Sequence, residues 1–299
     1  MNKLSIEDLD LEGRKVLMRV DFNVPLRDGK VDNDQRIVAA LPSIRYALEH
    51  GAALILMSHL GRPKGKGEPE PAFSLRPVAR RLSELIERPV QFAEDCVGAE
   101  AESKAAALKP GDVLLLENLR FHPGEKKPDK EPDFAGRLAA LGDVYVNDAF
   151  GTAHRAHSSM VGAAEQFERR AAGFLMKKEI DYFNQVLSSP QKPFLAILGG
   201  AKVADKIQVL EHLLERVDGL LVGGAMAYTF LAAQGIPVGA SRVERDQFDL
   251  ASRILAEAGK RGIEVGLPVD HVCGREFAEE TERQVTEGPE ISDGWMGLD

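Results

Sequence analysis

Short apolar runs alternate with stretches of helical periodicity over the first part of the chain. The runs show little alternation of apolar with polar residues, which is typical of strands buried on both faces of a parallel sheet. The predicted strands are Lys15–Asn23, Ala53–His59, Val90–Cys96, Asp112–Asn118 and Val144–Phe150. Helices are predicted between most of them, at Asp34–His50, Ser74–Glu87, Ala99–Leu108 and Asp133–Leu141. This order favours an α/β fold with a doubly wound sheet.

A second block of the same kind begins near Pro190. It predicts strands at Phe194–Gly200, Gly219–Gly224 and Gly262–Leu267, and helices at Lys202–Val217 and Gln247–Lys260. Phe174–Ser188 has helical composition and precedes a break at Pro190, so we expect a connecting helix there. We therefore expect two doubly wound, Rossmann-like domains joined by a helix, with domain 1 at 1–173, the connecting helix and hinge at 174–189, and a partial second domain at 190–299.

Composition narrows the class of protein. A length of 299 residues fits two domains, and 44% apolar residues suffice for a sizeable core. The formal charge of −9 argues against nucleic acid as the main partner. No apolar run reaches the roughly 18 residues of a membrane span, and the N-terminus lacks the pattern of a signal peptide. The two cysteines, Cys96 and Cys273, favour neither a disulfide framework nor a cysteine-based zinc site, and a cytoplasmic location is expected.

Polar and basic residues follow the predicted strands of the first block. In open α/β sheets, ligands bind beyond the carboxyl ends of the strands. Arg62, Arg120 and Arg155 follow three of these strands, and Arg36 lies in the helix after the first. One such arginine is most often a solvated surface residue, but four at adjacent strand ends predict a site for a small, multiply charged anion.

Other residues at these strand ends have plainer interpretations. His59 is compatible with a packed or capping role, and Asp21 with orienting an arginine. The sequence lacks HExxH, and His154 and His157 have no nearby carboxylate in sequence, so no metal site is expected.

The second block carries glycines where a strand meets a helix. Gly199-Gly200-Ala201-Lys202 follows the first predicted strand, Lys206 lies one turn further on, and Gly223-Gly224-Ala225 ends the next strand. Such turns let a backbone approach a phosphate, although a tight turn with an exposed lysine explains the pattern equally well. Neither GxxxxGK[ST] nor GxGxxG is present as a phosphate-binding motif. Two anion sites without a nucleophile triad predict phosphoryl transfer, in which positioning and electrostatics carry most of the catalysis.

Five segments together resemble phosphoglycerate kinase, in the same order and over the whole chain. They are Arg19–Pro25, Ser58–Pro63, Glu117–Phe121, Asn147–Arg155 and Gly199–Lys206. The resemblance implies reversible phosphoryl transfer from 1,3-bisphosphoglycerate to Mg-ADP, which gives 3-phosphoglycerate and Mg-ATP, in a monomeric glycolytic enzyme.

The resemblance also implies roles for individual residues. Phosphoglycerate would be bound by Asp21, Phe22, Asn23, Arg36, His59, Leu60, Gly61, Arg62, Arg120 and Arg155. The nucleotide would be bound by Gly200, Lys202, Lys206 and Gly224. Arg36 and Lys202 would balance the charge of the transferred group from opposite domains, and domain closure around 174–189 would exclude water.

Two departures from the family pattern modify this expectation. Ala225 stands where the resemblance implies a third glycine in many family members; its methyl group would narrow the adenosine pocket, but a residue this small is expected to be tolerated. The chain ends at Asp299, before the family's Gly-Gly-Asp loop, whose aspartate serves the Mg-nucleotide. We therefore expect a truncated kinase in which phosphoglycerate binding survives better than catalysis. The alternative is a non-catalytic phosphoglycerate-binding remnant, whereas the missing GxGxxG disfavours a nicotinamide dehydrogenase.

Overall fold

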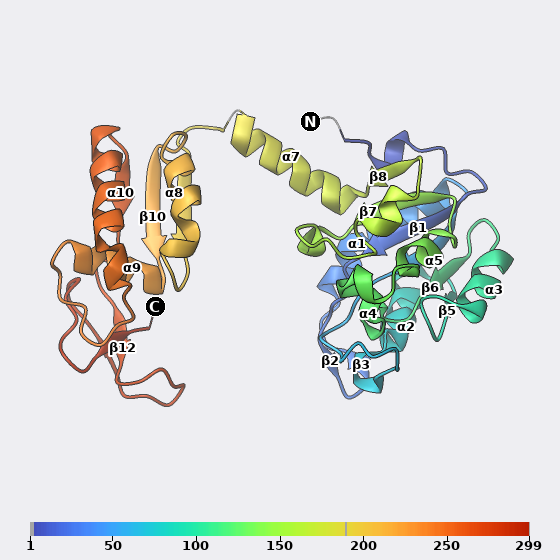
Figure 1. Ribbon diagram of the computed structural model, residues 1–299, viewed down its shortest axis with the longest axis horizontal. Coiled ribbons are helices and arrows are strands. Elements are labelled where there is room, and N and C mark those ends of the chain that lie inside the picture. The colour runs from blue at the N-terminus through green and yellow to red at the C-terminus, as the bar shows by residue number, and fades with distance from the viewer. Residues whose placement is uncertain (1–2, 189, 299) are drawn as a thin grey trace. The chain divides into compact units, whose positions relative to one another are not determined.

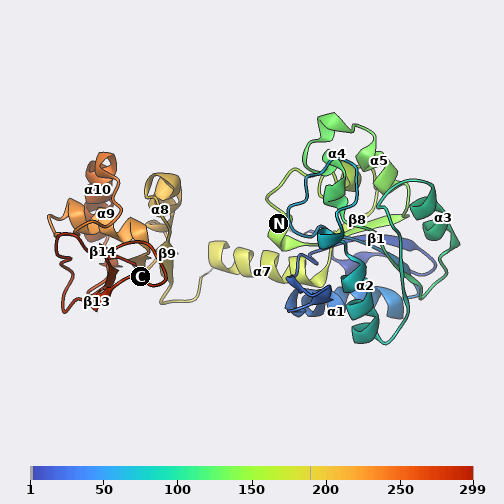
Figure 2. The same cartoon turned by 90° about the horizontal axis from the view of Figure 1, so that it is seen from below.

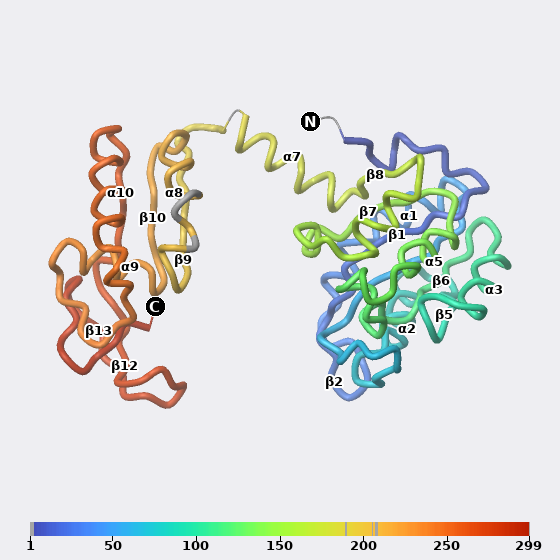
Figure 3. The backbone as a smooth tube through the Cα atoms, in the orientation of Figure 1, coloured from blue at the N-terminus to red at the C-terminus, as the bar shows by residue number. Residues whose placement is uncertain are grey.

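Two compact units make up the chain, of which the computed structural model describes residues 3–188 and 190–298 and, at 205, 207 and 208, the backbone alone. Unit 1 ends at Leu187 and unit 2 begins at Ser188 (Figure 1). The course of the chain through each unit can be followed in Figure 3. Among the described residues, no helix is long and apolar enough to cross a membrane.

Unit 1 is built around a six-stranded parallel sheet. Its strand order is β5-β6-β4-β1-β7-β8. The strands are β1 (Lys15–Val20), β4 (Ala53–Met57), β5 (Val90–Phe92), β6 (Val113–Leu115), β7 (Val144–Asp148) and β8 (Arg170–Ala172). The helices are α1 (Gln35–Glu49), α2 (Arg76–Ile86), α3 (Ala99–Ala107), α4 (Pro123–Lys126), α5 (Phe134–Ala139), α6 (Gly162–Glu165) and α7 (Phe174–Ser188).

Helices cover both faces of this sheet, as expected of a doubly wound fold. Successive residues of β1 point to opposite faces, so Met18 packs in the core under α1 and α2, whereas Leu17 packs in the core with α3, α5 and α6. Figure 2 shows α1 and α2 on one side of the sheet and α4 and α5 on the other. Burial on both faces explains why the strands lack a polar alternation.

The expected strands and helices of unit 1 are confirmed, with most ends trimmed by one or more residues. Gly51, with φ of +75°, follows α1 as a helix stop should. Sequence analysis missed β8, since Arg170-Ala171-Ala172 is too short and too weakly apolar to register as a strand. It also missed the hairpin of β2 (Leu26–Arg27) and β3 (Lys30–Val31).

Unit 2 contains a three-stranded parallel sheet and a small antiparallel one. The parallel order is β11-β10-β9, from β9 (Leu195–Gly199), β10 (Gly219–Gly223) and β11 (Glu264–Gly266). The helices α8 (Ile207–Leu213), α9 (Ala225–Ala233) and α10 (Phe248–Lys260) pack into one core with this sheet. The antiparallel order is β13-β12-β14, from β12 (Val272–Gly274), β13 (Arg283–Val285) and β14 (Met296–Gly297). Neither α9 nor the antiparallel sheet was expected.

The described helices of unit 2 leave one face of the parallel sheet uncovered. Alternate residues of β9 and β10 are exposed, among them Leu195, Ile197 and Leu221. The other face carries Ala196, Leu198 and Val222 into the core. Exposure of an apolar sheet face agrees with the expectation that the second sheet is incomplete.

The expected helix Lys202–Val217 was wrong at both ends. A 3-10 turn, Ala204–Lys206, comes first, and α8 begins only at Ile207 and ends at Leu213. The carboxylate of Glu244 accepts hydrogen bonds from the amides of Val203 (2.5 Å) and Ala204 (3.4 Å), which holds this stretch as a turn. Lys202 therefore precedes the helix, and the expectation that Lys206 lies one helical turn beyond it was also wrong, because Lys206 ends the 3-10 turn.

The first turn of α7 is bonded to the sheet of unit 1. Asp148, the last residue of β7, accepts hydrogen bonds through Oδ1 from the amides of Leu175 (2.8 Å) and Met176 (3.2 Å). Ser43 Oγ of α1 accepts a third from the Phe174 amide at 2.8 Å. The start of the expected connecting helix is thus fixed to two elements of unit 1.

Candidate functional site

Segments that follow β1, β4 and β6 meet at the carboxyl edge of the unit 1 sheet. Asn23 Oδ1 accepts a hydrogen bond from the Gly61 amide at 2.8 Å, and Arg120 donates one to the Gly61 carbonyl at 2.7 Å. A Cβ at Gly61 would lie 2.4 Å from the Phe73 ring, and φ there is +62°, so glycine is required. The structure thus brings Asn23, Gly61 and Arg120 together, as the sequence predicts.

Backbone groups of the same edge are held by buried polar side chains. The Phe22 amide donates to Ser58 Oγ at 2.9 Å, and the Leu60 amide donates to Asn118 Oδ1 at 3.2 Å. Asn118 is fully buried and returns a hydrogen bond to the Leu60 carbonyl at 2.8 Å. Sequence analysis missed these supporting roles of Ser58 and Asn118, although both residues lie within the motifs it singled out.

Asp21 contacts Arg36, as expected from the interpretation that it orients an arginine. Its Oδ2 lies 2.5 Å from Arg36 Nη1, and the arginine side chain is 53% exposed. Arg36 therefore stands at the start of α1 with its guanidinium anchored on one side and open to solvent on the other. The backbone of Gly151 lies close by, since a Cβ there would approach Asp21 Oδ2 to 2.7 Å.

His59 is buried and hydrogen-bonded to a buried arginine. Arg19 Nη2 lies 3.0 Å from His59 Nδ1, and both side chains are almost inaccessible to solvent. Arginine only donates, so Nδ1 accepts and the ring proton resides on Nε2. Burial, reinforced by Arg19 and Arg120, lowers the pKa of His59 to about 2. His59 is therefore a neutral hydrogen-bond donor.

Arg19 belongs to a buried network that sequence analysis did not identify. Its Nε donates to Ser159 Oγ at 3.0 Å, and Ser159 donates in turn to the buried carboxylate of Glu125 at 2.7 Å. Glu125 supplies the opposite charge that favours the protonated guanidinium, while burial lowers the pKa of Arg19. The available signal was an arginine within the apolar run Val16–Val20 of strand β1.

Positive charge at this edge exceeds the negative charge that faces it. Arg120 is buried, its Nε has no hydrogen-bond partner among the described residues, and burial lowers its pKa. Arg155, Arg19 and Arg62 lower it further by repulsion. Arg62 and Arg155 are exposed, and Arg155 Nε lies 3.2 Å from His154 Nε2. A bound anion would offset this repulsion.

The glycine turns of unit 2 touch one another. The Met226 amide, at the start of α9, donates to the Gly200 carbonyl at 2.8 Å. Gly224 has φ of +65°, and a Cβ there would lie 3.0 Å from the Gly200 amide nitrogen. The Lys206 side chain lies over Gly200, and Lys202 is exposed beside it in sequence. In this pair of turns, Gly200 and Gly224 have no side chains of their own to cover the backbone, and two lysines lie beside them. Such an arrangement can accommodate phosphate groups.

Ala225 and Glu244 complete the description of these turns. The Ala225 side chain packs against the core of Tyr228, Leu231 and Cys273, so its methyl group is directed to protein contacts. The Glu244 carboxylate is occupied by the backbone amides of Val203 and Ala204. The described residues here offer donors for phosphate but not a set of carboxylate ligands that fits Mg²⁺.

Fold and candidate site together define a class of protein: a two-unit α/β protein with an arginine-rich edge on one parallel sheet and two glycine turns at the strand ends of the other. Comparison with known proteins makes the assignment specific. The family model described as phosphoglycerate kinase matches residues 6–299. The chain therefore belongs to the phosphoglycerate kinase family.

Individual relatives agree with the family model. The phosphoglycerate kinase of Moorella thermoacetica is 55% identical over 299 residues, which cover 100% of this chain and 75% of that protein. That of Akkermansia muciniphila is 53% identical over 303 residues, covering 100% of this chain and 74% of the relative. Among solved structures, phosphoglycerate kinase from Coxiella burnetii is similar, with a TM-score of 0.83 and 39% identity over 100% of this chain and 74% of that one.

Proposed function

We propose that this chain binds phosphoglycerate at the edge of the unit 1 sheet and the phosphates of ADP or ATP at the glycine turns of unit 2. The reaction is phosphoryl transfer between 1,3-bisphosphoglycerate and ADP, giving 3-phosphoglycerate and ATP. The observation that carries the proposal is the uncompensated positive charge around Arg120, whose buried Nε lacks a partner among the described residues. Membership of the phosphoglycerate kinase family identifies the class of anion.

The proposed mechanism needs no general base, because the acceptor in the reverse direction is a carboxylate. His59 donates Nε2–H to the anion as a neutral group, and Arg62, Arg120 and Arg155 bind its oxygens. Arg36 and Lys202 stabilise charge on the transferred group. Mg²⁺ would neutralise nucleotide phosphates when bound, but the turns described above do not supply its ligand set, so no step is assigned to it.

Closure brings the two ligands into line and excludes water. The proposed hinge is 174–189, and the hydrogen bonds of Asp148 and Ser43 to the first turn of α7 support a bending point beyond Met176. We further propose that the chain acts as a monomer in the cytoplasm.

A calorimetric titration with 3-phosphoglycerate tests the unit 1 site. Arg62→Ala should weaken binding about 10- to 100-fold, which corresponds to one lost charge-assisted contact of about 1.5–3 kcal/mol. Arg80→Ala, an exposed arginine of α2, is the matched control and should bind like the unsubstituted chain. Absence of saturable binding by the folded chain would refute the site.

The alternative is a phosphoglycerate-binding protein without kinase activity, and the poor fit of the unit 2 turns to Mg²⁺ favours it. Titration with ADP and an assay of ATP formation separate the two candidates. Kinase function predicts ADP binding that Lys202→Ala weakens, together with turnover. Binding of 3-phosphoglycerate without turnover would establish the alternative.

A further inference from the structure

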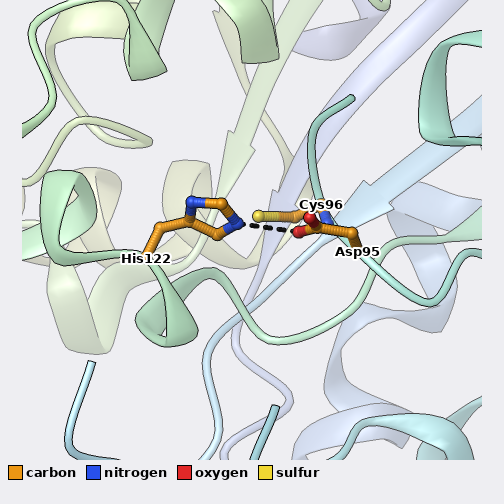
Figure 4. Close-up of side chains that lie close together, drawn as sticks. All are labelled: Asp95, Cys96 and His122. Atoms are coloured by element: carbon orange, nitrogen blue, oxygen red, sulfur yellow. Dashed lines mark hydrogen bonds and ion pairs between the residues drawn. The ribbon is translucent and has the colours of Figure 1, made fainter. Parts of the chain in front are cut away.

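A cluster of three potential metal ligands lies outside the anion site. Asp95 and Cys96 follow β5, and His122 follows the 3-10 helix Leu119–Phe121 after the neighbouring strand β6. One ligand atom from each residue lies within 4.8 Å of the others. Figure 4 shows the His122 ring directed toward the Asp95 carboxylate, with the Cys96 sulfur beside it. Asp95 and Cys96 are adjacent, but His122 lies 27 residues beyond Asp95, so the three do not form a recognisable metal-binding motif in the sequence.

The imidazole of His122 is held in one orientation. Its Nδ1 lies 3.0 Å from Glu131 Oε1, and its Nε2 lies 2.8 Å from Asp95 Oδ1. The ring also stacks on Phe134, with centroids 5.0 Å apart. A carboxylate on one ring nitrogen, with the other nitrogen directed at a ligand cluster, is the usual environment of a metal-binding histidine.

We propose that Asp95, Cys96 and His122 form a binding site for a thiophilic divalent cation such as Zn²⁺. The ligands are a carboxylate oxygen of Asp95, Sγ of Cys96 and Nε2 of His122, and water fills the fourth position. This donor set is one that tetrahedral zinc accepts. Glu131 acts as the outer partner that orients His122.

The geometry needs only small side-chain movements. Tetrahedral zinc with bonds of about 2.0–2.3 Å holds its ligand atoms about 3.3–3.6 Å apart. Nε2 and Oδ1 are now closer than this, and the widest separation in the cluster stays within 4.8 Å. Cys96 is fully buried, whereas the Asp95 side chain is 50% exposed, so the cation and its water enter past Asp95.

The charge balance also permits binding. Burial lowers the pKa of His122, but the hydrogen bonds to Asp95 and Glu131 outweigh it and raise the pKa overall. Burial raises the pKa of the Cys96 thiol. A divalent cation displaces the thiol proton and any proton on Nε2, which leave to solvent, and its two positive charges offset the carboxylate and the thiolate.

Titration of the whole chain with Co²⁺ tests the proposal, since cobalt reports thiolate ligation by a sulfur-to-metal charge-transfer band. We expect one equivalent to produce this band and Zn²⁺ to displace it. Cys96→Ser should abolish the band. Cys273→Ser, which alters the other buried cysteine, is the matched control and should retain it.

A second variant separates ligation from a general effect on folding. Glu131→Gln should keep the band but weaken affinity about 10- to 100-fold, because the outer partner of His122 loses its charge. Far-ultraviolet circular dichroism confirms that each variant is folded. No thiolate band in the unsubstituted chain, or a band that survives Cys96→Ser, would overturn the proposal and leave His122 as a hydrogen-bonded link between two carboxylates.

Discussion

His59 shows how one buried arginine determines what a neighbouring histidine can do. Arg19 reaches His59 Nδ1, and Glu125 balances Arg19 through Ser159. The charged imidazole is disfavoured because it would be buried beside a guanidinium. The histidine at the proposed anion site is thus a donor whose protonation state is independent of pH over the range in which enzymes are assayed.

The pH dependence of folding tests this arrangement. The pKa of His59 is about 2 when folded and about 6.5 when unfolded, so its stabilising contribution is present above pH 6.5 and is lost as pH falls toward 2. Relative to His59→Gln, the free energy of unfolding should fall by about 1.4 kcal/mol for each pH unit below about 6. Urea unfolding at several pH values measures it, and parallel profiles for the two proteins would contradict the buried neutral state.

Gly61 is the residue whose replacement should damage the proposed anion site most directly. A Cβ there meets the Phe73 ring at 2.4 Å, and the Gly61 backbone contacts both Asn23 and Arg120. Gly61→Ala should weaken 3-phosphoglycerate binding at least 10-fold, measured by calorimetry, because displacement of the backbone moves Arg120. Gly67→Ala controls for backbone strain, since Gly67 also has positive φ but open space around its Cβ position. Equal effects of the two substitutions would exclude the steric explanation.

At the scale of elements, Asp148 connects β7 to the start of α7. Asp148→Ala should lower the free energy of unfolding by about 0.5–2 kcal/mol, since two amides of the first turn lose their acceptor. Burial raises the pKa of Asp148, so the cost of burying its charge offsets part of the gain and favours the lower end of this range. Hydrogen exchange at Leu175 and Met176 should accelerate. Asp181→Ala, exposed on the same helix, should change neither quantity.

The sequence was most informative where burial is two-sided. A continuous apolar run such as Ala53–Met57 identifies a buried strand from the sequence alone, and all five expected strands of unit 1 are present. The pattern failed where tertiary contacts decide the structure. Glu244 holds Val203 and Ala204 in a turn from a distance of about forty residues in sequence, and α9 is apolar on nearly every side.

The candidate site shows the same division. Asn23, Gly61 and Arg120 could be predicted to lie together, because the carboxyl ends of parallel strands lie at one edge of the sheet. It could not assign the link between Arg19 and His59, since that contact depends on the register in which β1 lies beside β4. The cluster of Asp95, Cys96 and His122 likewise depends on β5 pairing with β6.

At the scale of the whole molecule, each unit has its own apolar core. We therefore expect two unfolding transitions, and the distribution of aromatic residues separates them. The single tryptophan, Trp295, is buried in unit 2 with the Arg275 guanidinium 3.9 Å from its ring centroid. Tryptophan fluorescence therefore follows unit 2 alone, whereas far-ultraviolet circular dichroism follows both units.

Ligands should shift these transitions selectively. With 3-phosphoglycerate at one hundred times its dissociation constant, the transition of unit 1 should gain about 2.7 kcal/mol, and the fluorescence transition of Trp295 should stay unchanged. ADP should shift the fluorescence transition instead, because its proposed contacts lie at Gly200, Lys202 and Gly224. A shift of the fluorescence transition by 3-phosphoglycerate alone would mean that its site includes residues of unit 2. The assignment of one ligand to each unit would then be wrong.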